Sequence, residues 1–139
     1  MFVLDTDVVS ELRKVRSGKA APGVAEWAAG VASAEMFISA ITIHELEHGV
    51  LLMERSDATQ GSVLRSWLDD SVAIAFAERV LDVDEDVARR AAALHVPDPA
   101  PFRDALIGAT ALVHRMSVVT RNVSDFQRFE GLEILNPWS

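Results

Sequence analysis

Short apolar segments that alternate with helical patterns are the feature of this sequence that most constrains its fold. Five such segments are apolar enough to form buried strands, at residues 2–4, 36–39, 80–83, 117–120 and 132–135. Strands separated by helices pair in parallel, because each crossing helix returns the chain to the same end of the sheet. The pattern therefore predicts an α/β/α sandwich, with a central parallel sheet of four to five strands and helices on both faces.

The segments between these strands carry apolar residues at helical spacing. Between residue 42 and about residue 54, apolar side chains recur three and four positions apart, which predicts a helix. Further helices are expected at residues 8–14, 57–75, 84–94 and 102–114, and one is expected to open at Pro22. Thr6 or Asp7 is the expected N-cap of the first helix. Three prolines at positions 97, 99 and 101 predict a loop before the last helix.

Chain length and composition limit the class of protein. With 139 residues and no cysteine, the sequence predicts one domain, residues 1–139, without disulfides or thiolate metal sites. No apolar run approaches the roughly 20 residues of a membrane span. The first residues lack the basic region of a signal peptide. We therefore expect a soluble, cytoplasmic protein that does not bind a membrane.

The net charge of −8 disfavours broad, nonspecific binding to nucleic acid, which depends mainly on Lys and Arg. It does not exclude a nuclease, however, because a cluster of catalytic acids is itself anionic. Bound divalent cations reverse the local electric field at such a cluster. The acidity also suits binding to a basic segment of a partner protein.

Acidic side chains follow the predicted strands at the end of the sheet where parallel sheets bind ligands. Asp5 follows the first strand, Glu45 lies near the start of the helix after the second, and Asp104 lies near the start of the last helix. Asn122 and Asp125 follow the fourth strand. Hard oxygen ligands suit Mg²⁺ or Mn²⁺, which activate water and stabilise a pentavalent phosphate. These positions predict a metal site for phosphoryl chemistry.

Each acid taken alone also has a structural explanation. Thr42 and Glu45 match a capping box, which alone accounts for both residues. Asp5 or Asp7 is suited to capping the first helix, and Asp104 to the positive end of its own helix. If all these acids are caps, the chain is a protein-binding module without catalytic activity. Because the acids all lie at predicted strand ends, their combination favours a site over a set of helix caps, but their spacing does not specify the reaction.

A second alternative lies in the helix that carries Glu45. Residues 44–48 match H-E-x-x-H, in which His44 and His48 would bind zinc and Glu45 would be the general base of a metallopeptidase. Against this, Glu47 is charged where zinc peptidases normally have an uncharged residue, and no third ligand is evident. We therefore expect His44 and His48 to be partly exposed helix residues.

Five segments, in order along the chain, resemble PIN-domain ribonucleases, specifically the VapC/FitB-like toxins of bacterial toxin–antitoxin pairs. They are residues 3–11 (VLDTDVVSE), 38–46 (ISAITIHEL), 103–111 (RDALIGATA), 119–126 (VTRNVSDF) and 136–138 (NPW). The resemblance implies a PIN-like fold and a Mg²⁺- or Mn²⁺-dependent endoribonuclease that cleaves RNA. It also implies a cognate antitoxin and a homodimer.

The resemblance also implies roles for individual residues. By position, the catalytic and metal-binding acids would be Asp5, Glu45 and Asp104. The further metal ligand would be Asn122 or Asp125. The supporting residues would be Thr6, Asp7 and Thr120, and the candidates for RNA phosphate contacts are Arg103 and Arg121. Two positions depart from the family pattern, since Asp7 stands where Asn is usual and Asn122 stands where many relatives have Asp.

Overall fold

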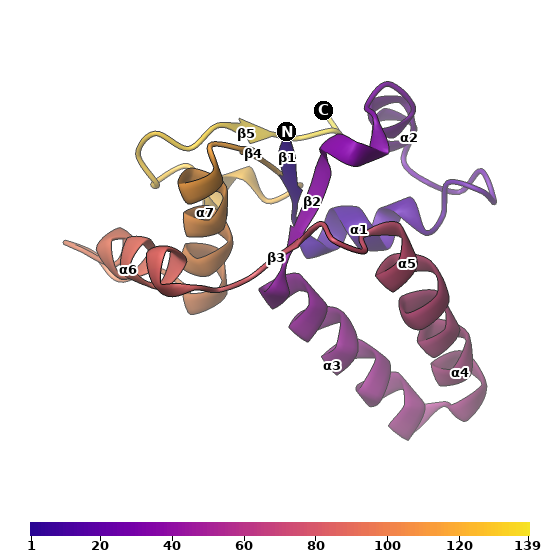
Figure 1. Ribbon diagram of the computed structural model, residues 1–139. Helices are drawn as coiled ribbons and strands as arrows, with labels where there is room; N and C mark the ends of the chain where they lie inside the picture. Colours follow the sequence, from indigo (N-terminus) through magenta and orange to yellow (C-terminus); the bar gives the residue numbers. More distant parts are fainter.

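The computed structural model describes residues 1–139 and contains one parallel sheet of five strands. The strands are β1 (Phe2–Leu4), β2 (Met36–Ser39), β3 (Val80–Leu81), β4 (Ser117–Val119) and β5 (Ile134–Leu135). Their order across the sheet is β3-β2-β1-β4-β5, which places β1 at the centre (Figure 1). The predicted parallel sheet and its five strands are confirmed.

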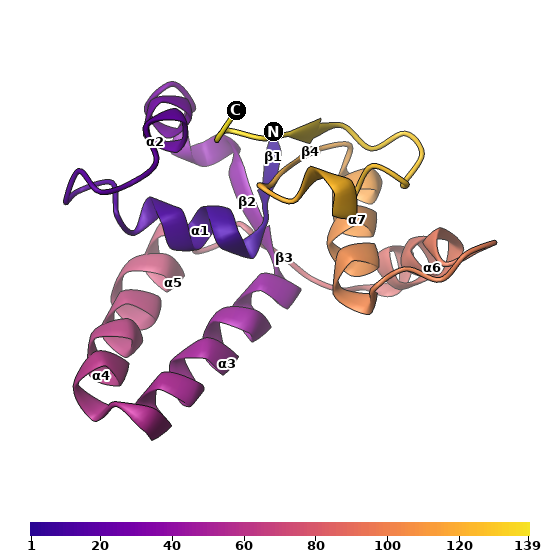
Figure 2. The ribbon, with the colours of Figure 1, turned by 180° about the vertical axis from the view of Figure 1, so that it is seen from behind.

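Helices cover both faces of this sheet. They are α1 (Thr6–Leu12), α2 (Pro22–Ala29), α3 (Ala40–Ser56), α4 (Ala58–Ser66), α5 (Ala73–Ala75), α6 (Glu85–Leu94) and α7 (Phe102–His114). A π-helical segment, Trp67–Val72, joins α4 to α5, and 3₁₀ turns span Ser33–Glu35 and Val123–Asp125. Helices α6 and α7 lie on one side of the sheet and α1, α2 and α5 on the other (Figures 1 and 2). None of the helices combines the length and apolar composition needed to span a membrane.

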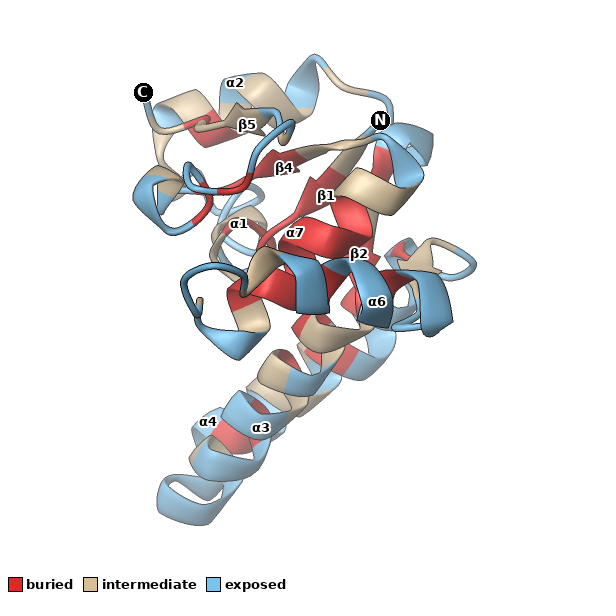
Figure 3. Ribbon diagram, turned by 90° about the vertical axis from the view of Figure 1, so that its left-hand side faces the viewer, coloured by how far each residue is buried: buried red, intermediate tan, exposed pale blue.

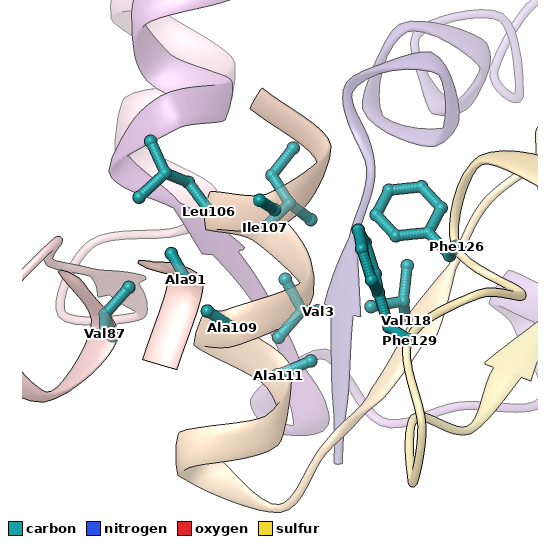
Figure 4. Close-up of a cluster of buried hydrophobic side chains, with 11 residues drawn as sticks. Val3, Val87, Ala91, Leu106, Ile107, Ala109, Ala111, Val118, Phe126 and Phe129 are labelled. Carbon is teal, nitrogen blue, oxygen red and sulfur yellow. The ribbon is translucent and has the colours of Figure 1, made fainter. Parts of the chain in front are cut away.

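The strands bury both of their faces, so the protein has two hydrophobic clusters. Val3 and Val118 point toward α7 and pack with Ile107 and Phe126 (Figure 4). Their neighbours in sequence, such as Leu4, point the other way and pack against α1 and α3. Successive strand residues alternate between the two faces. This burial on both faces explains why the strands appear in the sequence as continuous apolar runs.

Helices α3 and α4 form a two-helix arm that projects from the sheet and is most exposed at its far end (Figures 1 and 3). Arg65 of α4 binds Glu47 at 2.6 Å and Glu54 at 3.1 Å, both on α3. Gly61 permits the close approach of the helices, because a Cβ atom there would lie 2.5 Å from the Cα of Glu54. An ion-pair cluster and a close glycine contact therefore join the two helices of the arm.

The second helix of the arm and the segment that follows it differ from the prediction. A continuous helix was expected at residues 57–75, but α4 ends at Ser66 and a π-helical segment follows. The wider π-helical turn changes which side chains face the sheet and buries Leu68 and Val72. Apolar spacing does not distinguish α- from π-helical turns over so short a stretch.

Two helix starts also differ from the prediction, and both differences involve the candidate site. Asp5, rather than Thr6 or Asp7, caps α1, because its Oδ1 accepts the Thr6 N–H at 2.8 Å. Helix α3 begins at Ala40 rather than near Thr42, since Ser39 Oγ accepts the Ile41 N–H at 3.0 Å. Both caps are the residues at which the chain leaves a strand and enters a helix.

Candidate active site

Three carboxylates converge on one cation at the carboxyl ends of β1 and β2. Asp5 directly follows β1 and is 1% exposed, Glu45 lies on α3, and Asp104 lies in the first turn of α7. The guanidinium of Arg103 binds all three. Its Nη2 lies 2.6 Å from Asp5 Oδ1, its Nε lies 2.6 Å from Glu45 Oε2, and its Nη1 lies 2.7 Å from Asp104 Oδ1. The three acids and Arg103 are called the acid cluster below.

Threonine hydroxyls fix two of these carboxylates. Thr120 Oγ1 donates to Asp5 Oδ2 at 2.8 Å, and Thr6 Oγ1 donates to Glu45 Oε1 at 2.5 Å. Asp5 is thus held on one oxygen by Thr120 and on the other by Arg103 and the N–H of Thr6. A buried carboxylate is tolerated only when such hydrogen bonds replace its water. The threonines therefore orient the acids toward a shared point.

The capping-box explanation for Glu45 is wrong. Ser39 is the cap of α3, and Thr42 is fully buried inside the helix, where its hydroxyl lies 3.2 Å from that of Thr6. The Glu45 carboxylate turns away from its own backbone and binds Thr6 and Arg103, which belong to other elements. Local capping therefore does not account for Glu45.

The acids differ in their electrostatic environment. Burial would raise the pKa of Glu45, but hydrogen bonds from Arg103 and Thr6 hold that pKa below its ordinary value. Burial raises the pKa of Asp104, and the nearby charges of Asp125 and Asp5 add to this, although Arg103 partly offsets it. Burial opposes the charge of Arg103, yet its hydrogen bond to Glu45 and the Asp5 charge raise the pKa of the guanidinium. The positive charge of Arg103 therefore reduces the repulsion among the three carboxylates.

Asp7 lies beside the cluster and is incompletely paired. Its Oδ2 accepts the Arg121 N–H at 3.2 Å and the Asn122 side-chain amide at 3.3 Å, whereas its Oδ1 is buried without a hydrogen-bond partner. Burial and the charge of Asp5 raise the pKa of Asp7. The carboxylate at this position is therefore held at a cost to the folded state.

The remaining predicted residues lie around the rim. The Asn122 side chain is directed at Asp7, whereas Asp125, in the 3₁₀ turn after β4, is near enough for its charge to raise the pKa of Asp104. The guanidinium of Arg121 lies over the Trp138 ring, 5.4 Å from its centroid. Arg121 is thus separate from the acid cluster, in contrast to Arg103.

The donor chemistry of the cluster fits a hard divalent cation. Oxygens of Asp5, Glu45 and Asp104 already converge on a cation, and they belong to three different elements, as in sites built for Mg²⁺ or Mn²⁺. In the present arrangement, no three side chains of His, Cys, Asp or Glu lie close enough to share one metal ion. At the acid cluster, each carboxylate binds a different nitrogen of the planar Arg103 guanidinium, so the three carboxylates are spaced around it. Arg103 thus occupies the point at which the three carboxylates converge.

The histidines of the zinc-peptidase alternative do not form a metal site. The rings of His44 and His48 are both exposed, with centroids 6.4 Å apart. Glu45 is committed to Arg103 and Thr6, and no third ligand completes a set with the histidines. The two histidines are exposed helix residues, as expected from the sequence.

Arg103 was predicted from the sequence only as a possible phosphate contact, whereas the structure places it at the centre of the acid cluster. The available signal was its place next to Asp104 at the start of a helix, where a long side chain can fold back over its neighbour. Ser39, whose N-cap hydrogen bond starts α3, was not predicted from the sequence either. Strand-end serine followed by a helical pattern was the available signal.

A second concave region lies at the other end of β2. This apolar groove has a volume of about 520 Å³ and is lined by side chains of α1, β2 and the segment after α4, among them Leu12, Met36, Trp67, Val72 and Phe76. Met36 is the first residue of β2, whereas Ser39, at its last position, caps the helix of Glu45. The groove and the acid cluster thus lie at opposite ends of the same strand.

Comparison with known proteins identifies the family. The family model described as "PIN domain" matches residues 2–132, nearly the whole chain. The chain belongs to the PIN-domain family. Among its relatives, "VapC ribonuclease Y4jK" of Sinorhizobium fredii is 35% identical over 143 residues, covering 99% of this chain and 98% of the relative. "Toxin FitB" of Neisseria gonorrhoeae is 33% identical, covering 99% of both chains.

Solved structures agree with this assignment. The crystal structure of FitAcB from Neisseria gonorrhoeae superimposes on this PIN domain with a TM-score of 0.88 at 31% identity, covering 99% of each chain. A structure of VapBC2 from Rickettsia felis bound to a promoter DNA fragment shares the fold, with a TM-score of 0.70 at 20% identity. The family assignment implied by the sequence motifs is confirmed.

Proposed function

We propose that this PIN domain is an endoribonuclease that hydrolyses RNA phosphodiester bonds with Mg²⁺ or Mn²⁺ and acts as the toxin of a toxin–antitoxin pair. The observation that carries this proposal is the convergence of Asp5, Glu45 and Asp104 on a single cation. Relatives named ribonuclease and toxin, similar along the whole chain, support it. In the non-catalytic alternative Glu45 caps its own helix, which does not explain why its carboxylate binds Thr6 and Arg103 of other elements.

Asp5, Glu45 and Asp104 would hold the metal ion. Asp125 is the better candidate for an outer ligand than Asn122, because the Asn122 amide already donates to Asp7. When bound, Mg²⁺ or Mn²⁺ supplies a water of lowered pKa and charge stabilisation at the phosphate. Thr6 and Thr120 keep the carboxylates oriented, which reduces the reorganisation needed at the site.

Arg103 would bind the scissile phosphate once it leaves the carboxylates, since a guanidinium matches phosphate oxygens with two parallel hydrogen bonds. Asp104 is suited to accept the proton of the attacking water, because only its Oδ1 is hydrogen bonded, to Arg103. Arg121, stacked on Trp138, would contact a phosphate farther along the RNA. In this proposal Arg103 binds the phosphate and Asp104 accepts the proton, so the two neighbouring residues have different functions.

The apolar groove is suited to a protein partner. Solved relatives include toxin–antitoxin complexes, and we propose that a cognate antitoxin inserts apolar side chains into the groove lined by Leu12, Trp67 and Phe76. Arg13 lies over the Trp67 ring and Arg79 over the Phe76 ring, so the groove has a basic rim that suits acidic residues of a partner. We further propose that residues 1–139 act as one domain, because both hydrophobic clusters share one sheet. We propose that this domain forms a cytoplasmic homodimer, as the resemblance to VapC/FitB-like toxins implies.

The test is cleavage of total cellular RNA by purified protein in Mg²⁺, Mn²⁺, Zn²⁺ or EDTA, with Asp5→Asn beside the wild type. Cleavage is expected with Mg²⁺ or Mn²⁺, and is expected to disappear in EDTA and with Asp5→Asn. Asp70→Asn, a matched change at an exposed acid of the π-helical segment, is the control that retains activity. Full activity of Asp5→Asn would contradict the proposed site. No RNA cleavage with any metal ion, together with tight binding of Zn²⁺ through His44 and His48, would favour the zinc-peptidase alternative.

A further inference from the structure

A cavity of about 430 Å³ opens beside the acid cluster, between α3 and the start of α7. Glu45 and Arg103 belong to both the cavity wall and the cluster, so the two are continuous. The other prominent side chains of the wall are His44, His48 and Phe102. The volume lies within the range of about 300–1,000 Å³ that is typical of small-ligand sites.

Phe102 is placed as a stacking surface rather than as part of the core. It is 75% exposed, although it is the first residue of α7 and precedes Arg103 directly. Its ring stacks on His95 with an interplanar angle of 18° and centroids 6.5 Å apart. His95 is itself fixed, because its Nδ1 accepts the Ala100 N–H at 3.1 Å. His95 does not line the cavity, so it supports Phe102 from outside while the phenyl ring remains available to the cavity.

The opposite wall offers hydrogen-bonding groups that nothing else uses. The imidazoles of His44 and His48, one helical turn apart on α3, are exposed, and neither makes a side-chain hydrogen bond within the protein. A neutral imidazole both donates and accepts a hydrogen bond, which suits it to the polar edge of a base. The cavity thus combines an aromatic face with polar groups across from it.

Resting on the ribonuclease function proposed above, we propose that this cavity binds the base of a nucleotide next to the cleaved phosphate of single-stranded RNA. Phe102 stacks on the base, and His44 and His48 hydrogen bond to its edge. Because Phe102 and Arg103 are consecutive, a phosphate held by Arg103 brings its own nucleotide next to the phenyl ring. Base stacking on aromatic side chains is the usual way in which proteins bind unpaired nucleotides.

The test combines a protein change with an RNA change. The cut site is first mapped on cellular RNA, and an oligoribonucleotide with that site is made in three forms: intact, abasic on the 5′ side of the cut and abasic on the 3′ side. Wild type, Phe102→Leu and Phe102→Tyr are compared by their kcat and KM. Leucine keeps apolar bulk but removes the aromatic face, and tyrosine keeps that face. Ile74→Ala, which changes a 70% exposed residue far along the chain, is the matched surface control.

Phe102→Leu is expected to raise KM on intact RNA roughly tenfold, the size of one base-stacking contact, with kcat little changed. Phe102→Tyr should retain the wild-type KM, and Ile74→Ala should have no effect. One of the two abasic substrates should raise the KM of the wild type by a similar factor. With that substrate, Phe102→Leu should cause no further increase, because the lost base and the lost ring belong to the same contact.

An unchanged KM for Phe102→Leu would overturn the proposed base site while leaving the ribonuclease function in place. The same conclusion would follow if Phe102→Leu raised the KM of the abasic substrate by the same factor as that of intact RNA. If the wild type cleaves no RNA, no cut site can be mapped, and binding of a labelled single-stranded oligoribonucleotide of mixed sequence is measured by fluorescence anisotropy instead. Weaker binding by Phe102→Leu alone would then support the base site and contradict only the nuclease function. Equal binding by all variants, or no binding by any of them, would overturn the base site.

Discussion

The acid cluster and the apolar groove lie at opposite ends of β2, and they differ in what holds them together. At the carboxyl end, individual carboxylate oxygens accept directional hydrogen bonds from Arg103 and from two threonine hydroxyls. At the amino end, the groove is shaped by apolar side chains whose contacts are not directional. The first region should therefore be sensitive to the change of a single atom, and the second to the loss of volume.

The largest expected effect is at the acid cluster. Glu45→Gln replaces one carboxylate oxygen with an amide nitrogen, which removes a proposed metal ligand and an ion-pair partner of Arg103, and it should reduce RNA cleavage about a thousandfold. Glu47→Gln is the matched control on the same helix, because Glu47 binds Arg65 of the arm instead. Initial rates on RNA in Mn²⁺ measure both. Equal loss in the two variants would mean that α3, rather than the cluster, had been damaged.

The groove should show the reverse response. Leu12→Ala removes volume from the groove wall and should weaken binding to the antitoxin roughly tenfold, the size of one interface contact. RNA cleavage without antitoxin should not change, since the acid cluster lies at the other end of β2. Leu52→Ala, at a 56% exposed position on the arm, is the control. Titration of each variant with antitoxin, read as inhibition of cleavage, measures the effect, and equal inhibition of all three proteins would place the antitoxin elsewhere.

An effect of about the same size is expected when Arg103, the cation of the acid cluster, is removed. Arg103→Leu leaves three carboxylates without their shared partner, so the melting temperature in EDTA should fall. The same variant should bind Mn²⁺ roughly tenfold more tightly, because the metal ion no longer displaces a guanidinium. Calorimetric titration with Mn²⁺ measures this, and Arg121→Leu is the control, since Arg121 stacks on Trp138 outside the cluster. Unchanged Mn²⁺ affinity would show that Arg103 and the metal ion do not compete.

The sequence predicted the sheet and the gathering of its acids because both follow from local patterns. Apolar runs define strands that are buried on both faces, and residues that end parallel strands meet at one edge. The π-helical segment after Ser66 was not predictable, because apolar spacing resembles that of an α-helix over one or two turns. The direction of Glu45 was not predictable either, since a capping box and a cross-element contact share one sequence pattern.

Arg103 shows why side-chain contacts were the hardest feature to predict. Its sequence neighbours identify a helix start, but its partners Asp5 and Glu45 lie 98 and 58 positions away along the chain. Only the packed sheet brings them together. The groove could not be predicted from the sequence for the same reason, because its wall combines residues of α1, β2 and the segment after α4.

The smallest expected effect concerns Asp7, at the edge of the acid cluster. Its pKa in the folded protein is raised above the unfolded value by burial and by Asp5, so its ionised form opposes folding. This cost is absent below the ordinary pKa of an aspartate, about 4, and is complete above the folded pKa. Asp7→Asn removes the charge and keeps an oxygen that can accept the Arg121 N–H. Its melting temperature at pH 7 in EDTA should therefore exceed that of the wild type by about 3 °C.

The pH dependence separates this cause from a general gain in stability. As pH falls toward 4, wild-type Asp7 takes up its proton and the advantage of Asp7→Asn should disappear. Asp70→Asn, at an exposed acid, should match the wild type across the range. Melting curves from pH 4 to pH 7 test this, and a gain that persists at pH 4 would mean that charge is not its cause. A loss of stability at pH 7 would instead mean that the hydrogen bonds of the Asp7 carboxylate stabilise the folded protein by more than its burial costs.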